Sequence, residues 1–157
     1  MAAPLDPDNP VVKHCAAGMQ AEFAGRPAEA RHLFLLAWEE RRNDFEASIA
    51  AHYVARVQED PKAMLRWNEL ALQHAQAHAA AAGEQSVADF FPSLLLNMGW
   101  SYENLGDLPQ ARFYYGLAAE RVGLLAPGPY RATVEQGIAN GLARAGQADA
   151  DDAPGAA

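Results

Sequence analysis

The chain has a single cysteine, Cys15, among its 157 residues. An internal disulfide is therefore excluded, and a lone thiol is typical of a reducing compartment. The sequence also lacks a run of eighteen apolar residues and a basic, apolar N-terminal signal, so we expect a soluble, cytoplasmic protein with no membrane partner. Its 20 acidic residues outnumber its 12 basic ones, for a formal net charge of −8. This negative charge argues against a nucleic-acid partner.

Catalytic and cofactor motifs are missing as well. The sequence has no phosphate-binding loop, no dinucleotide fingerprint and no nucleophile elbow, so we predict no cofactor. His74 and His78 have a spacing that can bind a metal on one helix face, but no third ligand is evident, and we predict no metal site. These absences favour a protein that is not an enzyme, without excluding catalysis.

The sequence contains instead the pattern of an all-α domain. Few segments alternate polar and apolar residues, and Gly, Pro, Asn and Asp separate long apolar-periodic stretches. These signals predict seven helices, over residues 10–24, 27–41, 44–59, 61–81, about 89–105, 109–122 and 130–145. We expect residues 1–8 to be flexible, residues 9–146 to form one domain, and the acidic residues 147–157 to be a disordered tail.

The most informative stretch is 99–118, which reads as two helices joined by a tight turn. Gly99 and Ala111 remove bulk where two antiparallel helices would cross. Tyr102 and Tyr115 fill the space on either side, and Ala118 makes room for a further helix. Such a pair cannot bury its apolar face alone, so the pattern is expected to recur.

The pattern does recur, once clearly and once in degenerate form. The clear copy consists of Gly18, Ala21, Gly25, Ala30, Phe34 and Ala37, and the degenerate copy of Ala51, Val54, Ala63, Trp67 and Leu70. The interval between these two copies is close to the roughly 34 residues of the tetratricopeptide repeat (TPR). The chain thus resembles the TPR family, and in particular a small stand-alone bacterial member of it.

The resemblance implies an α-solenoid of three TPR helix pairs followed by a C-terminal capping helix. In TPR folds the first helix of each pair lines a concave groove, which implies a groove that binds a peptide or protein partner. The residues that matching positions place in this groove are Met19, Glu22, Phe23, Phe45, His52, Arg56, Asn97, Trp100, Glu103 and Asn104.

Three alternatives remain open from the sequence. The large aromatic residues Phe23, Phe45 and Trp100 are equally well explained as core. The groove could also close into a pocket of a small-molecule binder or enzyme, with His52 as acid or base and Arg56 as anion anchor. Finally, the apolar face around residues 113, 114 and 117 (Phe, Tyr and Leu) could form a homodimer.

Overall fold

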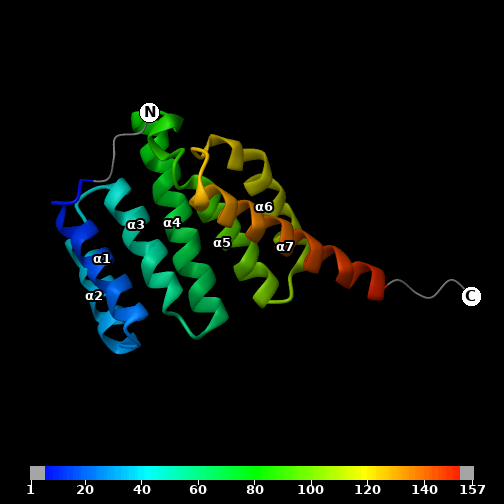
Figure 1. Ribbon diagram of the computed structural model, residues 1–157, viewed down its shortest axis with the longest axis horizontal. Coiled ribbons are helices and arrows are strands. Elements are labelled where there is room, and N and C mark those ends of the chain that lie inside the picture. Colours follow the sequence, from blue (N-terminus) through cyan, green and yellow to red (C-terminus); the bar gives the residue numbers. More distant parts are fainter. Residues whose placement is uncertain (1–5, 153–157) are drawn as a thin grey trace, which may run out of the picture. The chain divides into compact units, whose positions relative to one another are not determined.

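The computed structural model describes residues 6–152, and the side chains of residues 6–147. The regular structure of this part of the chain is entirely helical, which confirms the all-α class (Figure 1). The α-helices are α1 (Pro10–Phe23), α2 (Pro27–Glu40), α3 (Asp44–Arg56), α4 (Pro61–Ala82), α5 (Phe91–Asn104), α6 (Leu108–Arg121) and α7 (Pro129–Asp152). Two short 3₁₀ helices are η1 (Glu84–Val87) and η2 (Val122–Leu124).

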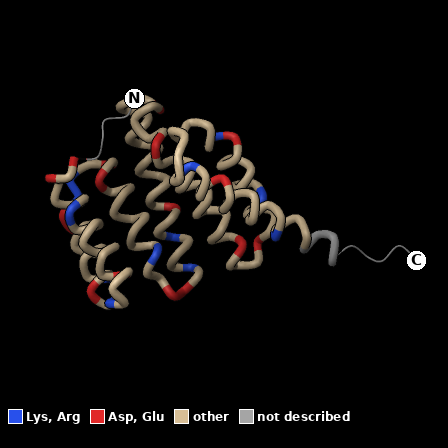
Figure 2. Tube along the Cα trace, viewed as in Figure 1, with Lys and Arg blue, Asp and Glu red and all other residues tan. Residues whose placement is uncertain are grey.

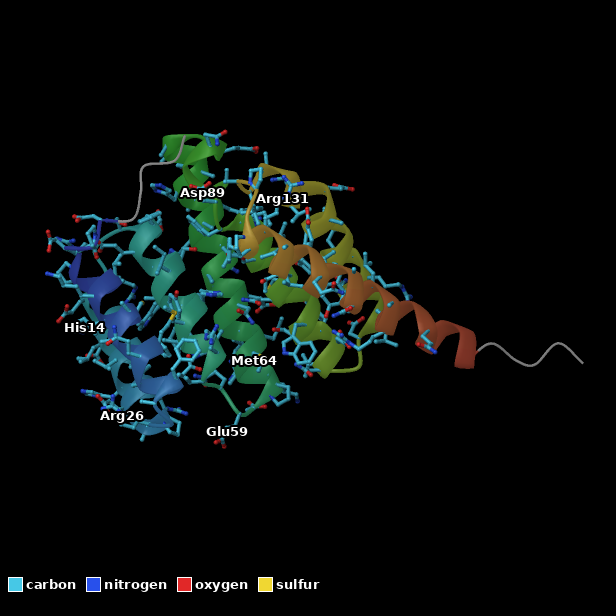
Figure 3. All side chains as sticks on the ribbon, in the orientation of Figure 1. His14, Arg26, Glu59, Met64, Asp89 and Arg131 are labelled. Carbon is cyan, nitrogen blue, oxygen red and sulfur yellow. The ribbon has the colours of Figure 1, made fainter. Side chains whose placement is uncertain are left out.

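The predicted domain 9–146 contains two compact units, one ending at Val87 and the other beginning at Ala88. In the first unit α1 packs against α2 and α3 against α4, while α3 also contacts α1 and α2. Figure 3 shows Arg26, after α1, and Glu59, after α3, at the same end of this unit. The two hairpins therefore turn on the same side.

The second unit consists of α5, α6 and α7, each in contact with the other two. Its helices begin where the sequence predicts. Pro92 lies in the first turn of α5, where a missing N–H costs nothing, and the Asp107 side chain accepts a hydrogen bond from the Gln110 N–H at the start of α6.

Small residues stand where the paired helices cross, as predicted. A Cβ atom at Gly18 would collide with the ring of Phe34 on α2. A Cβ atom at Gly99 would lie 2.5 Å from Cδ1 of Tyr115 on α6. Phe34 and Tyr115 are fully buried, and they follow their glycines at the same spacing. The α1–α2 and α5–α6 pairs are thus each held together by an aromatic ring packed on a bare helix backbone.

The turns after α1 and α5 are also alike. Gly25 and Gly106 have φ angles of 71° and 78°, in the left-handed region that favours glycine. In each turn the N–H of the next residue donates to a carbonyl within the preceding helix, from Arg26 to Ala21 and from Asp107 to Tyr102, at 2.9 Å in both. The two turns therefore have one backbone geometry.

In each unit a third helix packs on the same buried ring. In the first unit Tyr53 of α3 stacks on Phe34, with ring centroids 5.3 Å apart. In the second, α7 approaches Tyr115 through Gly141, where a Cβ atom would lie 2.6 Å from Cε1 of the ring. The sets α1–α2–α3 and α5–α6–α7 thus share the same order of contacts.

Two predicted helix ends are wrong, because α3 ends at Arg56 rather than near residue 59 and α7 continues beyond residue 145. Residues 147–152, expected to be disordered, continue α7 to Asp152. Gly146 does not have the positive φ angle of a turn glycine, and its backbone continues the helix. The alanines around it favour helix. Residues 153–157 lie outside the described part of the chain, as do residues 1–5 of the N-terminal segment expected to be flexible.

Within the described residues no helix combines the length and apolar character that crossing a membrane requires. Charged residues of both signs are interspersed along the trace, as Figure 2 shows. Many of them lie near the helix ends, as Asp60 does at the start of α4, where its side chain accepts hydrogen bonds from two backbone N–H groups.

Candidate binding face

On the first unit, two of the predicted groove residues form an ion pair between α1 and α3. The Arg56 Nη2 atom lies 3.2 Å from Oε2 of Glu22, and Nε donates to the same oxygen at 3.3 Å. His52 lies one turn before Arg56 on α3. Burial, and then the positive charge of Arg56, lowers the pKa of His52 to about 4, so its imidazole is neutral at physiological pH.

The second unit holds a larger polar cluster that ties three helices together. Arg144 of α7 makes two hydrogen bonds to Glu103 of α5, from Nε to Oε1 at 2.6 Å and from Nη2 to Oε2 at 3.1 Å. The Tyr115 hydroxyl of α6 donates to Oε2 of the same carboxylate at 2.5 Å. The bonds from Arg144 and Tyr115 lower the pKa of Glu103, against the opposing effect of burial. Burial, and then the bond to Glu103, raises the pKa of Tyr115.

These two ion pairs occupy equivalent positions. Glu22 follows Gly18 by the same spacing at which Glu103 follows Gly99, and each carboxylate lies one turn beyond its helix crossing. Tyr53 and Gly141 are the residues of α3 and α7 that meet the buried ring. Arg56 follows Tyr53 by the same spacing at which Arg144 follows Gly141. The same link between alternate helices therefore occurs once in each unit.

Trp100 gives the second unit an exposed aromatic surface beside its ion pair. The Trp100 side chain is 45% exposed, and the Arg144 guanidinium lies over the indole, 5.4 Å from the ring centroid. We call the surface formed by Trp100, Glu103 and Asn104 of α5 with Asn140 and Arg144 of α7 the α5–α7 face. Its members recur at spacings of about one helical turn, so they share one side of each helix.

The other predicted groove residues differ in exposure. Met19 packs against the core around Phe34. Phe45 is half-buried, with its ring 5.3 Å from that of His78. Phe23 is 88% exposed, so the alternative that places it in the core is wrong, and so is that alternative for Trp100. Asn97 is half-buried and Asn104 is exposed, both on α5.

Sequence reasoning missed Glu46, which is almost fully buried at the start of α3. Its carboxylate accepts hydrogen bonds from Arg42 and, at 2.7 Å, from the Asn9 side chain that also caps α1. Burial raises its pKa, but the bonds from Arg42 and Asn9 outweigh that effect and lower it. The sequence signal was the cap residue Asn43 followed three positions later by a glutamate.

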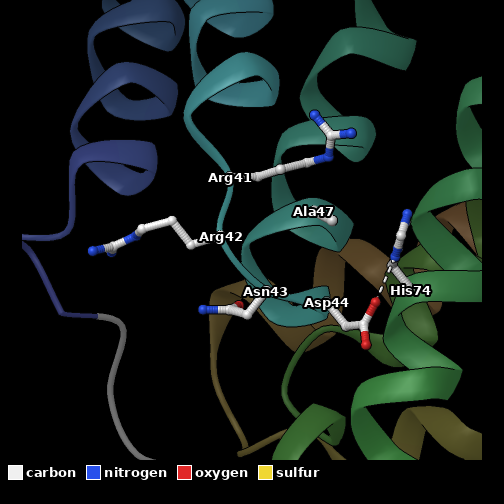
Figure 4. Close-up of a pocket in the computed structure, with 6 residues that line it drawn as sticks. All are labelled: Arg41, Arg42, Asn43, Asp44, Ala47 and His74. Carbon is white, nitrogen blue, oxygen red and sulfur yellow. Dashed lines mark hydrogen bonds and ion pairs between the residues drawn. The ribbon is translucent and has the colours of Figure 1, made fainter.

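An open hollow of about 460 Å³ lies where α2 meets α3, next to α4 (Figure 4). Its lining residues are Arg41, Arg42, Asn43, Asp44, Ala47 and His74. His74 and Asp44 are engaged with each other, with Nδ1 and Oδ1 2.7 Å apart. The Arg41 guanidinium lies 3.6 Å from the centroid of the Trp38 ring. The hollow is thus lined by side chains that are already engaged within the first unit.

Reactive groups are sparse on the described part of the chain. No three His, Cys, Asp or Glu side chains are placed there to hold a metal ion. Cys15 is buried, and burial raises the pKa of its thiol to about 12, which leaves it protonated and unreactive. His74 and His78 contact Asp44 and Phe45 respectively rather than a common point.

Comparison with protein-family models, with curated proteins and with solved structures finds no match to this chain. The assignment of function therefore depends on the residues and contacts described above.

Proposed function

We propose that this chain is a cytoplasmic repeat protein of the TPR type, which binds a peptide or protein through its first helices and catalyses no reaction. In this proposal α1–α2, α3–α4 and α5–α6 are three TPR pairs of an α-solenoid, and α7 is the capping helix. The recurring glycine–ring crossing, glycine turn and Glu–Arg link support the repeat assignment. The side of α7 that carries Gln136 and Asn140, which hydrogen-bond to each other, is polar, as a cap requires.

The observation that carries the binding proposal is the exposed indole of Trp100 with the Arg144 guanidinium over its ring. Exposed aromatic side chains are enriched at the energetic centres of protein interfaces, because they bury a large apolar area at low entropic cost. Arg144 is held in place by Glu103, so the surface around the indole is preorganised.

The experiment compares Trp100→Ala with the matched control Phe113→Ala. Phe113 is a second large aromatic residue of the same unit, 57% exposed on α6. Tagged wild-type protein and both variants are used for affinity capture from the native cell, followed by quantitative mass spectrometry. We expect wild type and Phe113→Ala to capture the same protein set, and Trp100→Ala to recover at least about tenfold less of it.

Circular dichroism and thermal unfolding establish that both variants keep the fold. Equal capture by Trp100→Ala and wild type, with the fold intact, would contradict the proposal. Loss of capture with Phe113→Ala alone would move the binding surface to α6. Sedimentation at micromolar concentration tests the predicted homodimer through α6 separately, because only a dimer would dissociate on dilution.

The pocket alternative built on His52 and Arg56 has no comparable support. His52 has a pKa near 4, so it carries almost no proton to donate at neutral pH.

A further inference from the structure

The solvent-facing part of the Glu103–Arg144 pair is mainly the cation. The Arg144 side chain is 48% exposed, whereas that of Glu103 is only 16% exposed, because Glu103 lies between Arg144 and the buried Tyr115. Arg144 uses Nε and Nη2 for its two bonds to Glu103, and a guanidinium carries five N–H donors in all, so these two bonds do not exhaust it. The exposed guanidinium is therefore a donor site for an anion.

Trp100 lies beside this donor. A partner group that binds the exposed Arg144 guanidinium would bring its neighbouring residues over the exposed indole. The indole favours apolar side chains and the guanidinium favours carboxylates. The pair of side chains thus fits an acidic residue followed or preceded by an apolar one.

Helices α5 and α7 run in the same direction along the face. Leu96 meets Gly137, and seven residues further along both helices Glu103 meets Arg144. In this register Trp100 lies level with Gly141, the residue after Asn140, and the exposed Asn104 follows one turn later on α5. The Asn104 amide and the Nδ2 group of Asn140, whose Oδ1 accepts from Gln136, can bond to peptide groups before and after the acidic residue. This arrangement favours an internal segment of the partner, which continues in both directions, rather than the end of its chain.

We infer that the α5–α7 face binds an internal Asp or Glu side chain of its partner on Arg144, with an adjacent apolar side chain on Trp100. The inference rests on the proposed peptide-binding function and adds the chemistry of the partner segment. The carboxylate accepts from N–H groups of the guanidinium other than those bound to Glu103, while Glu103 keeps the guanidinium in place.

The test uses three blocked tripeptides on the full chain at low salt. They are acetyl-Leu-Glu-Leu-amide, its neutral isostere acetyl-Leu-Gln-Leu-amide, and acetyl-Leu-Gln-Leu with a free terminal carboxylate. Proton–nitrogen NMR follows the indole N–H signals of Trp38, Trp67 and Trp100, with Trp100→Phe identifying the last. We expect the glutamate peptide to shift the Trp100 signal, with an affinity about five- to tenfold above that of the glutamine amide.

Trp38 and Trp67 contact each other in the first unit, and we expect their signals to stay in place. Equal affinity of the glutamate and glutamine amides would overturn the inference. A free terminal carboxylate that binds as tightly as the glutamate side chain would overturn the assignment to an internal residue. Both comparisons use the wild-type protein, so they do not depend on the folding of a variant.

Two arginine variants localise the effect. Arg144→Gln should remove the preference for the glutamate peptide, whereas Arg56→Gln, which breaks the equivalent pair in the first unit, should retain it. An unchanged preference in Arg144→Gln would overturn the inference. If Trp100→Ala abolishes capture while the tripeptides show no preference, the partner chemistry is wrong and the binding function stands.

Discussion

The sets α1–α2–α3 and α5–α6–α7 share a backbone plan but hold their central ring differently. In the first set Phe34 packs on Gly18 and stacks on the side chain of Tyr53. In the second set the Tyr115 ring lies between two glycines, Gly99 and Gly141, and its hydroxyl donates to Glu103. The first ring is therefore held by apolar packing alone, and the second by close backbone contact together with a hydrogen bond to a charged group.

This difference shows how one helix arrangement tolerates different side chains at its centre. The first unit admits a bulky Tyr53 because α3 stands off from the ring by the thickness of a second ring. In the second unit the glycine lets α7 pack directly on the ring, and the Tyr115 hydroxyl of α6 joins Arg144 on the Glu103 carboxylate. Charge-assisted hydrogen bonds of this kind are about twice as strong as neutral ones.

The largest effect should come from closing the gap that Gly141 leaves. We expect Gly141→Ala to destabilise the protein by about 1–3 kcal/mol, because its Cβ atom would overlap the Tyr115 ring, which is held by Gly99 on its other side. Urea unfolding followed by circular dichroism measures the change. The equivalent position in the first unit already holds a tyrosine, so a Cβ atom is harmful only in the second.

Gly116→Ala is the matched control for this substitution. Gly116 lies within α6, and a Cβ atom there would meet nothing within 4 Å. Helix propensity predicts that Gly116→Ala stabilises the protein by about 0.5–1 kcal/mol. If both glycine variants changed stability alike, the close approach of α7 to Tyr115 would be disproved.

The second prediction concerns the pH dependence of stability, which His52 gives to the first set only. His52 of α3 has a pKa lowered to about 4 from 6.5, so between these values the unfolded chain binds a proton that the folded chain does not. Stability should therefore fall with falling pH, by about 1–2 kcal/mol from pH 7 to pH 5. The equivalent position of α7 holds Asn140, so His52→Asn should remove this part of the pH dependence.

Urea midpoints at pH 7 and pH 5 test this prediction on wild type and His52→Asn. His32→Gln, at an exposed histidine of α2, is the control and should keep the wild-type dependence. A pH dependence that persists unchanged in His52→Asn would show that other groups are responsible.

The smallest effect should come from making the second ring chemically like the first. Tyr115→Phe removes the hydroxyl that donates to Glu103 but leaves both bonds from Arg144. We expect a loss of about 0.5–1.5 kcal/mol in the free energy of unfolding, measured in urea. The pKa of Glu103 should rise, since one of the bonds that lower it is gone, and carbon-detected NMR titration of the carboxyl measures that rise. An unchanged pKa would rule out the hydroxyl as a contributor.

Much of the fold could be predicted because its signals are local. Cap residues such as Asn9, Asp60 and Asp107 mark helix starts, and glycines such as Gly25 and Gly106 mark the turns. The extent of α7 was missed because Gly146 resembles those turn glycines but has an ordinary helical backbone. A glycine permits a positive φ angle without requiring one.

The candidate site was predictable residue by residue but not as a set of contacts. Spacing placed Glu22, Arg56, Trp100 and Glu103 on first-helix faces, and the exposure of Trp100 agrees with that placement. Spacing did not indicate that each carboxylate would be paired with an arginine from another helix, because the distance between those helices depends on the side chains packed between them.

The amino-acid order alone determined the helices, their turns and the two crossings where a glycine meets an aromatic ring, because those depend on residues close in sequence or on bare backbone. Only the tertiary structure decided which charges pair and which face solvent. That outcome depends on the packing of the third helix on the buried ring, which brings residues distant in sequence together, through Tyr53 in one unit and Gly141 in the other. An arginine reaches the carboxylate in both units, but only the second unit has a ring with a hydroxyl, Tyr115 in place of Phe34, that reaches it as well.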